Sequence, residues 1–376
     1  MSAQAEIKPI AAIHKGMPEL DTPENRVTSF FEFWPVQLIY LPVVFQWLWL
    51  SLRYRSLSLP LVANPSIPLA GMVGESKSAV LKLAGKQAAS HIAPFICLQN
   101  NHAEPVRERV GRALEKIKQA NIDFPLIAKP DIGCRGAGVR IIHNRRALKD
   151  YLIQFPDGAK LLLQKKIKHE AEAGIFYIRY PGQSRGKIFS ITLKYAPYVN
   201  GDGVHSLQHL IEKDPRASKI AEIYFNRHRE SLQQIIADKM AFRLAFAGSH
   251  CRGSIFRNGN AHITPALSHA FDEITADIKD FYYGRFDVRF ESIAQLKQGH
   301  AFTILEINGA ASEATHIWDK NSSLAEVYRT LFYQYKTLFR IGSINRRNGH
   351  KLPSILQLFK AWRTESKLVK QYPETD

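Results

Sequence analysis

Residues 33–52, FWPVQLIYLPVVFQWLWLSL, are uncharged and strongly apolar, and they limit what the first part of the chain can become. A helix of this length could cross a bilayer, and Arg53 and Arg55 follow it directly. Pro35 and Pro42, two glutamines and aromatic rings near both ends favour a segment that lies at an interface or fills a groove. We therefore expect this segment to contact a membrane surface, to pack against the rest of the chain, or to form a homodimer surface.

The composition is that of a globular protein with a large excess of positive charge. Lys and Arg total 51 against 34 Asp and Glu, a formal net charge of +17. Such an excess favours anionic partners, but no zinc-finger spacing, basic heptad region or RNP-type motif indicates nucleic acid, which is not an expected partner. Three cysteines without CxxC spacing indicate a reducing compartment. We therefore expect a cytoplasmic protein, with association at the inner face of the membrane as an open alternative.

The pattern of the sequence changes near residue 121 and divides the chain into segments. Strands and helices are mixed beyond that point, without the regular alternation of a doubly wound fold, and this predicts an α+β module. The expected segments are an N-terminal arm (1–60), a small α/β domain (61–120), the module (121–345, with parts 121–195 and 196–345) and a basic, loosely patterned C-terminal tail (346–376).

The first group of candidate functional residues lies in FPLIAKPDIGCRGAGV, residues 124–139. Lys129 stands near the end of an apolar strand, and Gly133, Gly136 and Gly138 follow in a loop. Glycines let backbone N–H groups approach phosphate oxygens closely, and the lysine supplies a fixed positive charge. An ordinary hairpin loop would use the same glycines, but the adjacent lysine favours a polyphosphate site.

The second group lies in two predicted strands, 284–291 and 301–308. Asp287 projects from the first, and Glu306 and Asn308, two positions apart, share one face of the second. Oxygen ligands of this kind suit Mg²⁺ held jointly with phosphates. An acidic residue inside FTILEING would be costly to bury without a cation, so a metal site is favoured over a solvated surface charge.

Together these groups resemble the ATP-grasp superfamily over about residues 120–320. The phrases GRFDV (284–288) and LEIN (305–308) are similar to those of D-alanine–D-alanine ligases, and YVNGDGVHSLQHLIEKDPR (198–216) is similar to a stretch of cyanophycin synthetases. The resemblance implies two α+β subdomains that clamp ATP with Mg²⁺ or Mn²⁺. It also implies a ligase that joins a carboxylate to an amine, or to a thiol, through an acylphosphate.

The resemblance further implies roles for individual residues. Arg285 would stabilise the oxyanion of the tetrahedral intermediate, and the alternative is a structural partner of Asp287 or Glu291. Lys194 would bind phosphate, and the alternative is a solvated lysine at the end of a strand. The implied nucleotide contacts are Lys129, Gly133, Arg135, Gly136, Gly138, Gln164, Lys165, Ile167 and, for the ribose, Glu172 in preference to Glu170. The implied metal ligands are Asp287, Glu306 and Asn308.

The acceptor side departs from the D-alanine ligases, because GAASEATH follows Asn308 where they have Pro-Gly. The substrates therefore stay open beyond a small carboxylate and an amine. Candidate pocket residues, which would suit an acidic substrate, are Arg252, Arg289, Glu313 and His316. Glu75 is expected to cap a helix, with contact to a substrate amine as the alternative. Two other functions remain open: a non-catalytic ATP-binding or membrane-associated assembly protein, and a small-molecule kinase with the same clamp.

Overall fold

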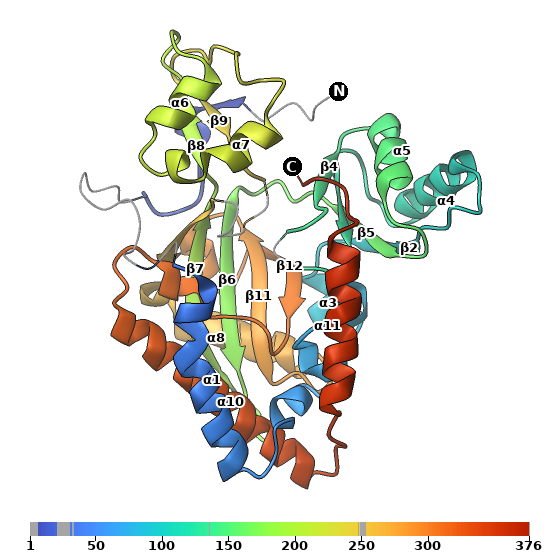
Figure 1. Cartoon of the computed structure of the whole chain (residues 1–376), viewed down its shortest axis with the longest axis vertical. Helices are drawn as coiled ribbons and strands as arrows, with labels where there is room; N and C mark the ends of the chain where they lie inside the picture. Colours follow the sequence, from blue (N-terminus) through green and yellow to red (C-terminus); the bar gives the residue numbers. More distant parts are fainter. Residues whose placement is uncertain are drawn as a thin grey trace.

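The computed structural model describes residues 7–20, 31, 34–134, 136–246, 248 and 253–375. Helices and strands are mixed along the chain, and the strands form three sheets (Figure 1). Every pairing between the described strands is antiparallel. The predicted α+β class is confirmed.

A five-stranded sheet lies at the centre of the molecule (Figure 1). Its strands, in spatial order, are β10 (Ile255–Asn258), β7 (Lys187–Tyr195), β6 (Ala171–Ile178), β11 (Tyr283–Phe290) and β12 (Phe302–Asn308). The associated helices are α8 (Pro265–Ala276), α9 (Ile293–Lys297) and α10 (Leu324–Arg347). Alternate side chains of β6 sort to the two faces, because Ala173 and Ile175 pack in the cluster of α8 whereas Phe176 and Ile178 pack in that of α10.

A second sheet forms the lobe that carries the glycine-rich loop. Its strands, in spatial order, are β2 (Phe95–Gln99), β5 (Lys160–Lys165), β3 (Leu126–Pro130) and β4 (Arg140–Ile142), and its helices are α4 (Val106–Gln119) and α5 (Arg145–Gln154). Apolar residues of both helices and of the sheet form one core, which includes Leu98, Val110 and Leu148. The predicted boundary at residue 120 is therefore not a structural one, because β2 and α4 precede it and belong to this lobe.

A third, smaller lobe contains a three-stranded sheet. Its strands, in spatial order, are β1 (Ile7–Pro9), β9 (Met240–Arg243) and β8 (Tyr198–Asn200), and its helices are α6 (Leu207–Lys213) and α7 (Ala221–Arg227). Strand β1 shows that the beginning of the described chain pairs with residues more than 200 positions away.

Short helical turns join these units. They are α2 (Lys77–Leu81), α3 (Lys86–Ser90) and the 3-10 turns Ile10–Ala12, Leu59–Val62, Pro68–Gly71, Ala217–Ile220, Asn260–His262 and Thr315–Trp318. The fixed φ of proline near the start of a turn favours the 3-10 conformation found at Leu59–Val62.

The apolar segment at residues 33–52 forms helix α1 (Val36–Arg53) as far as it is described, and α1 packs along α10 (Figure 1). Ile39, Val43 and Leu50 are buried in this contact. The other side of α1 leaves seven large apolar residues about half exposed or more: Leu38, Leu41, Val44, Phe45, Leu48, Trp49 and Leu52. None of the described helices is both long and apolar enough to span a bilayer. The exposed side of α1 is the part that would contact a membrane or a second copy of the chain, and both contacts stay predictions.

Residues 346–376 are not the loosely patterned tail that the sequence suggested. Helix α10 continues to Arg347, and a further helix, α11 (Ile355–Val369), runs along the edge of the molecule (Figure 1). Ser354 and Gln357 form a capping box at its start, a signal that is present in the sequence. Leu368 and Tyr372 pack against the core of the second sheet, so this end of the chain belongs to the fold.

Candidate functional site

The polar candidates of the central sheet all lie on one face. Their neighbours Ala173, Leu193, Phe286, Val288 and Ile307 point into the core beneath α8, so the alternate residues point the opposite way. The residues on this second face are Glu172 of β6, Lys194 of β7, Arg285, Asp287 and Arg289 of β11, and Glu306 and Asn308 of β12. Strand alternation thus brings together groups that are 136 positions apart in the sequence, from 172 to 308.

Asp287 is at the centre of a buried charge network. Its carboxylate accepts from Arg285 Nε at 2.8 Å and pairs with Lys194 Nζ at 2.9 Å. Burial alone would raise the pKa of Asp287, but the charges of Arg285 and Lys194 outweigh it and lower the pKa to about 2. The carboxylate is therefore ionised at neutral pH. Arg285 has the structural partner that the sequence offered as an alternative, and its catalytic role stays a prediction.

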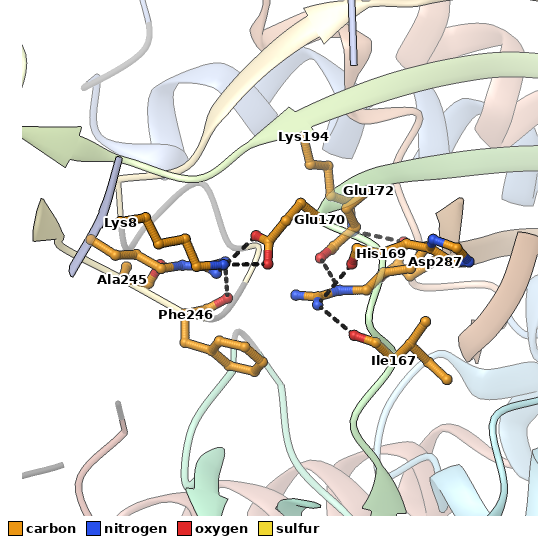
Figure 2. Close-up of polar contacts among 11 residues, drawn as sticks. Lys8, Ile167, His169, Glu170, Glu172, Lys194, Ala245, Phe246 and Asp287 are labelled. Carbon is orange, nitrogen blue, oxygen red and sulfur yellow. Dashed lines mark hydrogen bonds and ion pairs between the residues drawn. The ribbon is translucent and has the colours of Figure 1, made fainter. Parts of the chain in front are cut away.

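The two candidate ribose acids bind different cations (Figure 2). Glu170 pairs with Lys8 of β1 at 2.6 Å and with Arg243 of β9 at 3.5 Å, so the third lobe holds it. Glu172 pairs with Lys194 at 3.3 Å and so joins the network of Asp287. The preference for Glu172 as the ribose contact stays a prediction.

A β-bulge links the two larger sheets. Asp287 pairs with Glu306 and Val288 with Ile304, so Leu305 is the extra residue between them. Its carbonyl oxygen accepts hydrogen bonds from Lys129 Nζ at 3.1 Å and from Gln164 Nε2 at 3.2 Å. The bulge therefore places the lysine of the second sheet beside the acidic residues of the first.

Lys129 is a buried ammonium group near a carboxylate. Burial lowers its pKa, and the negative charge of Glu306 offsets part of that effect. Glu306 also pairs with Lys77 of α2 at 3.6 Å, and Lys77 Nζ donates to the carbonyl oxygen of Gly133 at 2.5 Å. This chain of contacts joins the glycine-rich loop to β12.

The three predicted metal ligands could hold a divalent cation. Asp287 and Glu306 are paired across β11 and β12, and Asn308 lies two residues further along the same face. The amide nitrogen of Asn308 is buried without a hydrogen-bond partner, and turning the amide would present its oxygen there instead. Among the described residues, no three His, Cys, Asp or Glu side chains gather as a metal cluster, so such a cation would depend on Asn308 and on ligand oxygens.

The glycine-rich loop is fastened to the start of α2. Asp131 accepts from the hydroxyl of Ser76 at 2.7 Å and from the backbone N–H of Ser78 at 2.8 Å. Gly138 has φ +71, and a Cβ there would lie 2.8 Å from Pro130 Cγ, so this position requires glycine. Gly133 and Gly136 lie in the same loop, whereas Arg135 lies outside the described residues.

The predicted adenine segment is held from the central sheet. Arg289 NH1 donates to the carbonyl oxygens of Ile167 at 3.2 Å and His169 at 3.1 Å (Figure 2). Gln164 is buried at the interface of the two sheets, and Lys165 is exposed at the end of β5. Arg289 thus positions this segment, although the sequence suggested it as a substrate contact.

The candidate acceptor residues lie beyond Asn308. Burial raises the pKa of Glu313, whose backbone oxygen accepts from Arg285 and whose carboxylate accepts from Trp318. Glu75 does not cap α2, because Ser76 is the capping residue. The carboxylate of Glu75 instead accepts a hydrogen bond from the N–H of Gly309 at 2.9 Å. Burial raises the pKa of Glu75 to about 8. His316 is buried, and Arg252 lies outside the described residues.

Two buried histidines should make the free energy of unfolding fall in acid. Burial lowers the pKa values of His228 and His316 from 6.5 to about 4. The unfolded chain binds protons at these imidazoles before the folded chain does, so the stability present above pH 6.5 is lost as the pH falls toward 4. We expect a loss of about 2 kcal/mol per histidine between about pH 7 and pH 5 in urea unfolding, and a smaller loss in His228→Gln and His316→Gln. An unchanged pH dependence in both variants would contradict this.

Two residues that contribute to the site could not be identified from the sequence. Neither Lys77 nor Lys8 was among the site residues predicted from the sequence. Both reach the site through tertiary contacts, Lys77 because α2 packs on β12 and Lys8 because β1 pairs with β9. The position of Lys77 directly after the glycine-containing loop at residues 71–76 was the one local signal for it.

Comparison with known proteins gives structural likenesses at low sequence identity. No protein-family model and no curated protein matches the sequence. Solved structures similar to the chain include D-alanine–D-alanine ligase from Bacillus anthracis, with 14% identity, a TM-score of 0.41 and coverage of 76% of this chain and 72% of that one. VanG D-Ala:D-Ser ligase from Enterococcus faecalis has 13% identity, a TM-score of 0.38 and coverage of 71% and 62%.

A bifunctional glutathione synthetase from Pasteurella multocida has 15% identity, a TM-score of 0.35 and coverage of 69% of this chain. The chain spans 36% of that enzyme's length and less than two thirds of the VanG ligase. These structures are named as ligases or a synthetase, the kinds of enzyme that the motifs also resemble.

Proposed function

We propose that the protein is an ATP- and Mg²⁺-dependent ligase that activates a carboxylate as an acylphosphate and transfers it to an amine or a thiol. The observation that carries this is an excess of buried positive charge between the two larger sheets. In the network of charged side chains between the two larger sheets, five described cations face three carboxylates. The cations are Lys77, Lys129, Lys194, Arg285 and Arg289, and the carboxylates are Glu172, Asp287 and Glu306.

The excess of cations supports a polyanionic ligand. Glu75 adds little negative charge at neutral pH because its pKa is about 8. Lys129 is 6% exposed and Lys194 is also 6% exposed, so water compensates them poorly. Phosphate oxygens would supply the missing negative charge, and the N–H groups of the glycine-rich loop would bind them from the other side.

The residues have distinct roles in the proposed reaction. Lys129 and Lys194 would bind and orient phosphate oxygens, and Arg285 would stabilise the oxyanion formed when the nucleophile attacks. Asp287, Glu306 and Asn308 would hold Mg²⁺, which when bound would offset phosphate charge. The buried carboxyl groups of Glu75 and Glu313 flank the segment after Asn308, where an acceptor amine would find hydrogen-bond acceptors.

Glu306→Gln should abolish turnover while leaving the fold intact. We expect ADP and phosphate release to fall by about 100-fold or more, because the amide keeps the shape of the side chain but loses the charge that Mg²⁺ and Lys77 require. The measurement is Mg²⁺-ATP turnover across a panel of amino acids, dipeptides and small acids, with Glu230→Gln, in the third lobe, as the matched control.

The same assay separates the other two functions. Release of phosphate that depends on an amine or a thiol supports ligation, whereas a stable phosphorylated product would support a small-molecule kinase. Mg²⁺-ATP binding without turnover on any substrate would support a non-catalytic ATP-binding protein. Turnover unaffected by Glu306→Gln would contradict the proposed site itself.

A further inference from the structure

The end of the chain holds the glycine-rich loop in place. Tyr372 donates its hydroxyl to the carbonyl oxygen of Ile132 at 2.6 Å. The hydroxyl of Thr375 accepts from the N–H of Gly138 and donates to the carbonyl oxygen of Gly136, both at 3.0 Å. Residues 370–375, which we name the C-terminal clasp, thus bind the backbone of the loop near both its ends.

The clasp is itself anchored in the second lobe. The ring of Tyr372 stacks on Phe155, with centroids 5.4 Å apart, and packs in the core of that lobe. Arg140 Nε of β4 donates to the carbonyl oxygen of Glu374 at 2.7 Å. Tyr151 of α5 donates to the carbonyl oxygen of Gly138 at 2.8 Å, so the loop and the clasp share one support.

Helix α11 extends this support to the other loop beside the site. Glu365 accepts from the N–H of Gly74 at 2.7 Å, and a Cβ at Gly74 would lie 3.4 Å from Ala361. The segment at Gly74 leads directly into Glu75 and Lys77, which contact Gly309 and Glu306. Helix α11 and the clasp therefore support both the glycine-rich loop and the segment from Gly74 to Lys77, which contacts Glu306.

We propose that the C-terminal clasp positions the glycine-rich loop for nucleotide phosphates, with Tyr372 and Thr375 as the positioning residues. The role in nucleotide binding rests on the proposed function, whereas the contact between the clasp and the glycine-rich loop does not. Ordering the loop before binding spares the entropy that an unfastened loop would lose on closing over phosphate. Loss of the clasp should therefore weaken ATP binding while the contacts on the central sheet stay as they are.

The test is hydrogen exchange of residues 131–139 together with Mg²⁺-ATP affinity, measured on the full chain. In Tyr372→Phe/Thr375→Val we expect faster exchange of this segment without nucleotide and affinity about tenfold weaker, because three hydrogen bonds to the loop are removed. Thr375→Ser in an otherwise unchanged chain should keep both properties. Thr364→Val is the matched control, because the Thr364 hydroxyl donates to the carbonyl oxygen of Lys360 in its own helix and does not contact the glycine-rich loop in the described part of the chain.

Each result decides a different point. Exchange that does not change in the double variant would overturn the clasp. Faster exchange with unchanged ATP affinity would show that the clasp orders the loop but would overturn its role in nucleotide binding. Wild-type protein that binds no Mg²⁺-ATP would overturn the proposed function and with it the nucleotide part of this inference, while the exchange data would still report on the clasp.

Discussion

Lys129→Met is expected to weaken Mg²⁺-ATP binding by about 100-fold and, without nucleotide, to raise the free energy of unfolding by about 1 kcal/mol. The two effects have one cause. The ammonium group is buried, burial lowers its pKa, and its hydrogen bond is to a neutral carbonyl oxygen, that of Leu305. Methionine fills a similar volume without the cost of a buried charge, but it cannot bind phosphate.

The pair of opposite changes makes this prediction specific. Replacing a residue that merely supports the fold would lower the free energy of unfolding. Replacing a surface lysine would change neither the free energy of unfolding nor the ATP affinity. Titration calorimetry measures the affinity, and urea unfolding measures the stability. Lys160→Met at the exposed start of β5 is the matched control, with both properties expected to be unchanged. Loss of stability by several kcal/mol in Lys129→Met, or ATP affinity within twofold of wild type, would contradict the assignment.

Much of the central sheet could be predicted from the sequence because its signals are local. Period-two alternation and apolar runs predicted strands at 284–291 and 301–308, close to the observed β11 and β12. Glu306 and Asn308 were placed on one face by their spacing, and the structure puts them opposite β11. Lys129 was found because it directly precedes a glycine-rich loop.

What could not be predicted depends on contacts between distant segments. The bulge at Leu305, which presents a carbonyl oxygen to Lys129, arises from the pairing of β11 with β12 and has no sequence signal of its own. Lys8 reaches Glu170 only because three residues of β1 pair with β9. The basic composition of residues 346–376 concealed a helix whose capping box was readable, but no local pattern indicates that Thr375 would meet the glycine-rich loop.

Asp287→Asn is expected to lower the free energy of unfolding by about 3–5 kcal/mol in the absence of nucleotide. The carboxylate is buried between Arg285 and Lys194, whose charges lower its pKa to about 2, and no other carboxylate pairs with Arg285 among the described residues. The amide keeps the volume but leaves Arg285 without a carboxylate partner and Lys194 with Glu172 as its remaining one. Asp150→Asn on the exposed side of α5 should change stability by no more than about 0.5 kcal/mol.

The second variant Asp287→Asn/Arg285→Met tests whether charge is the cause. Removal of the arginine should restore part of the lost stability, because one uncompensated cation disappears with it, and a double-variant cycle in urea gives the coupling between the two residues. Mg²⁺-free ATP should also stabilise Asp287→Asn more than wild type, since its phosphates would bring negative charge to the uncompensated cations. A single variant that loses less than about 1 kcal/mol, or a double variant that is simply additive, would show that Asp287 is not the anion on which this cluster of buried cations depends.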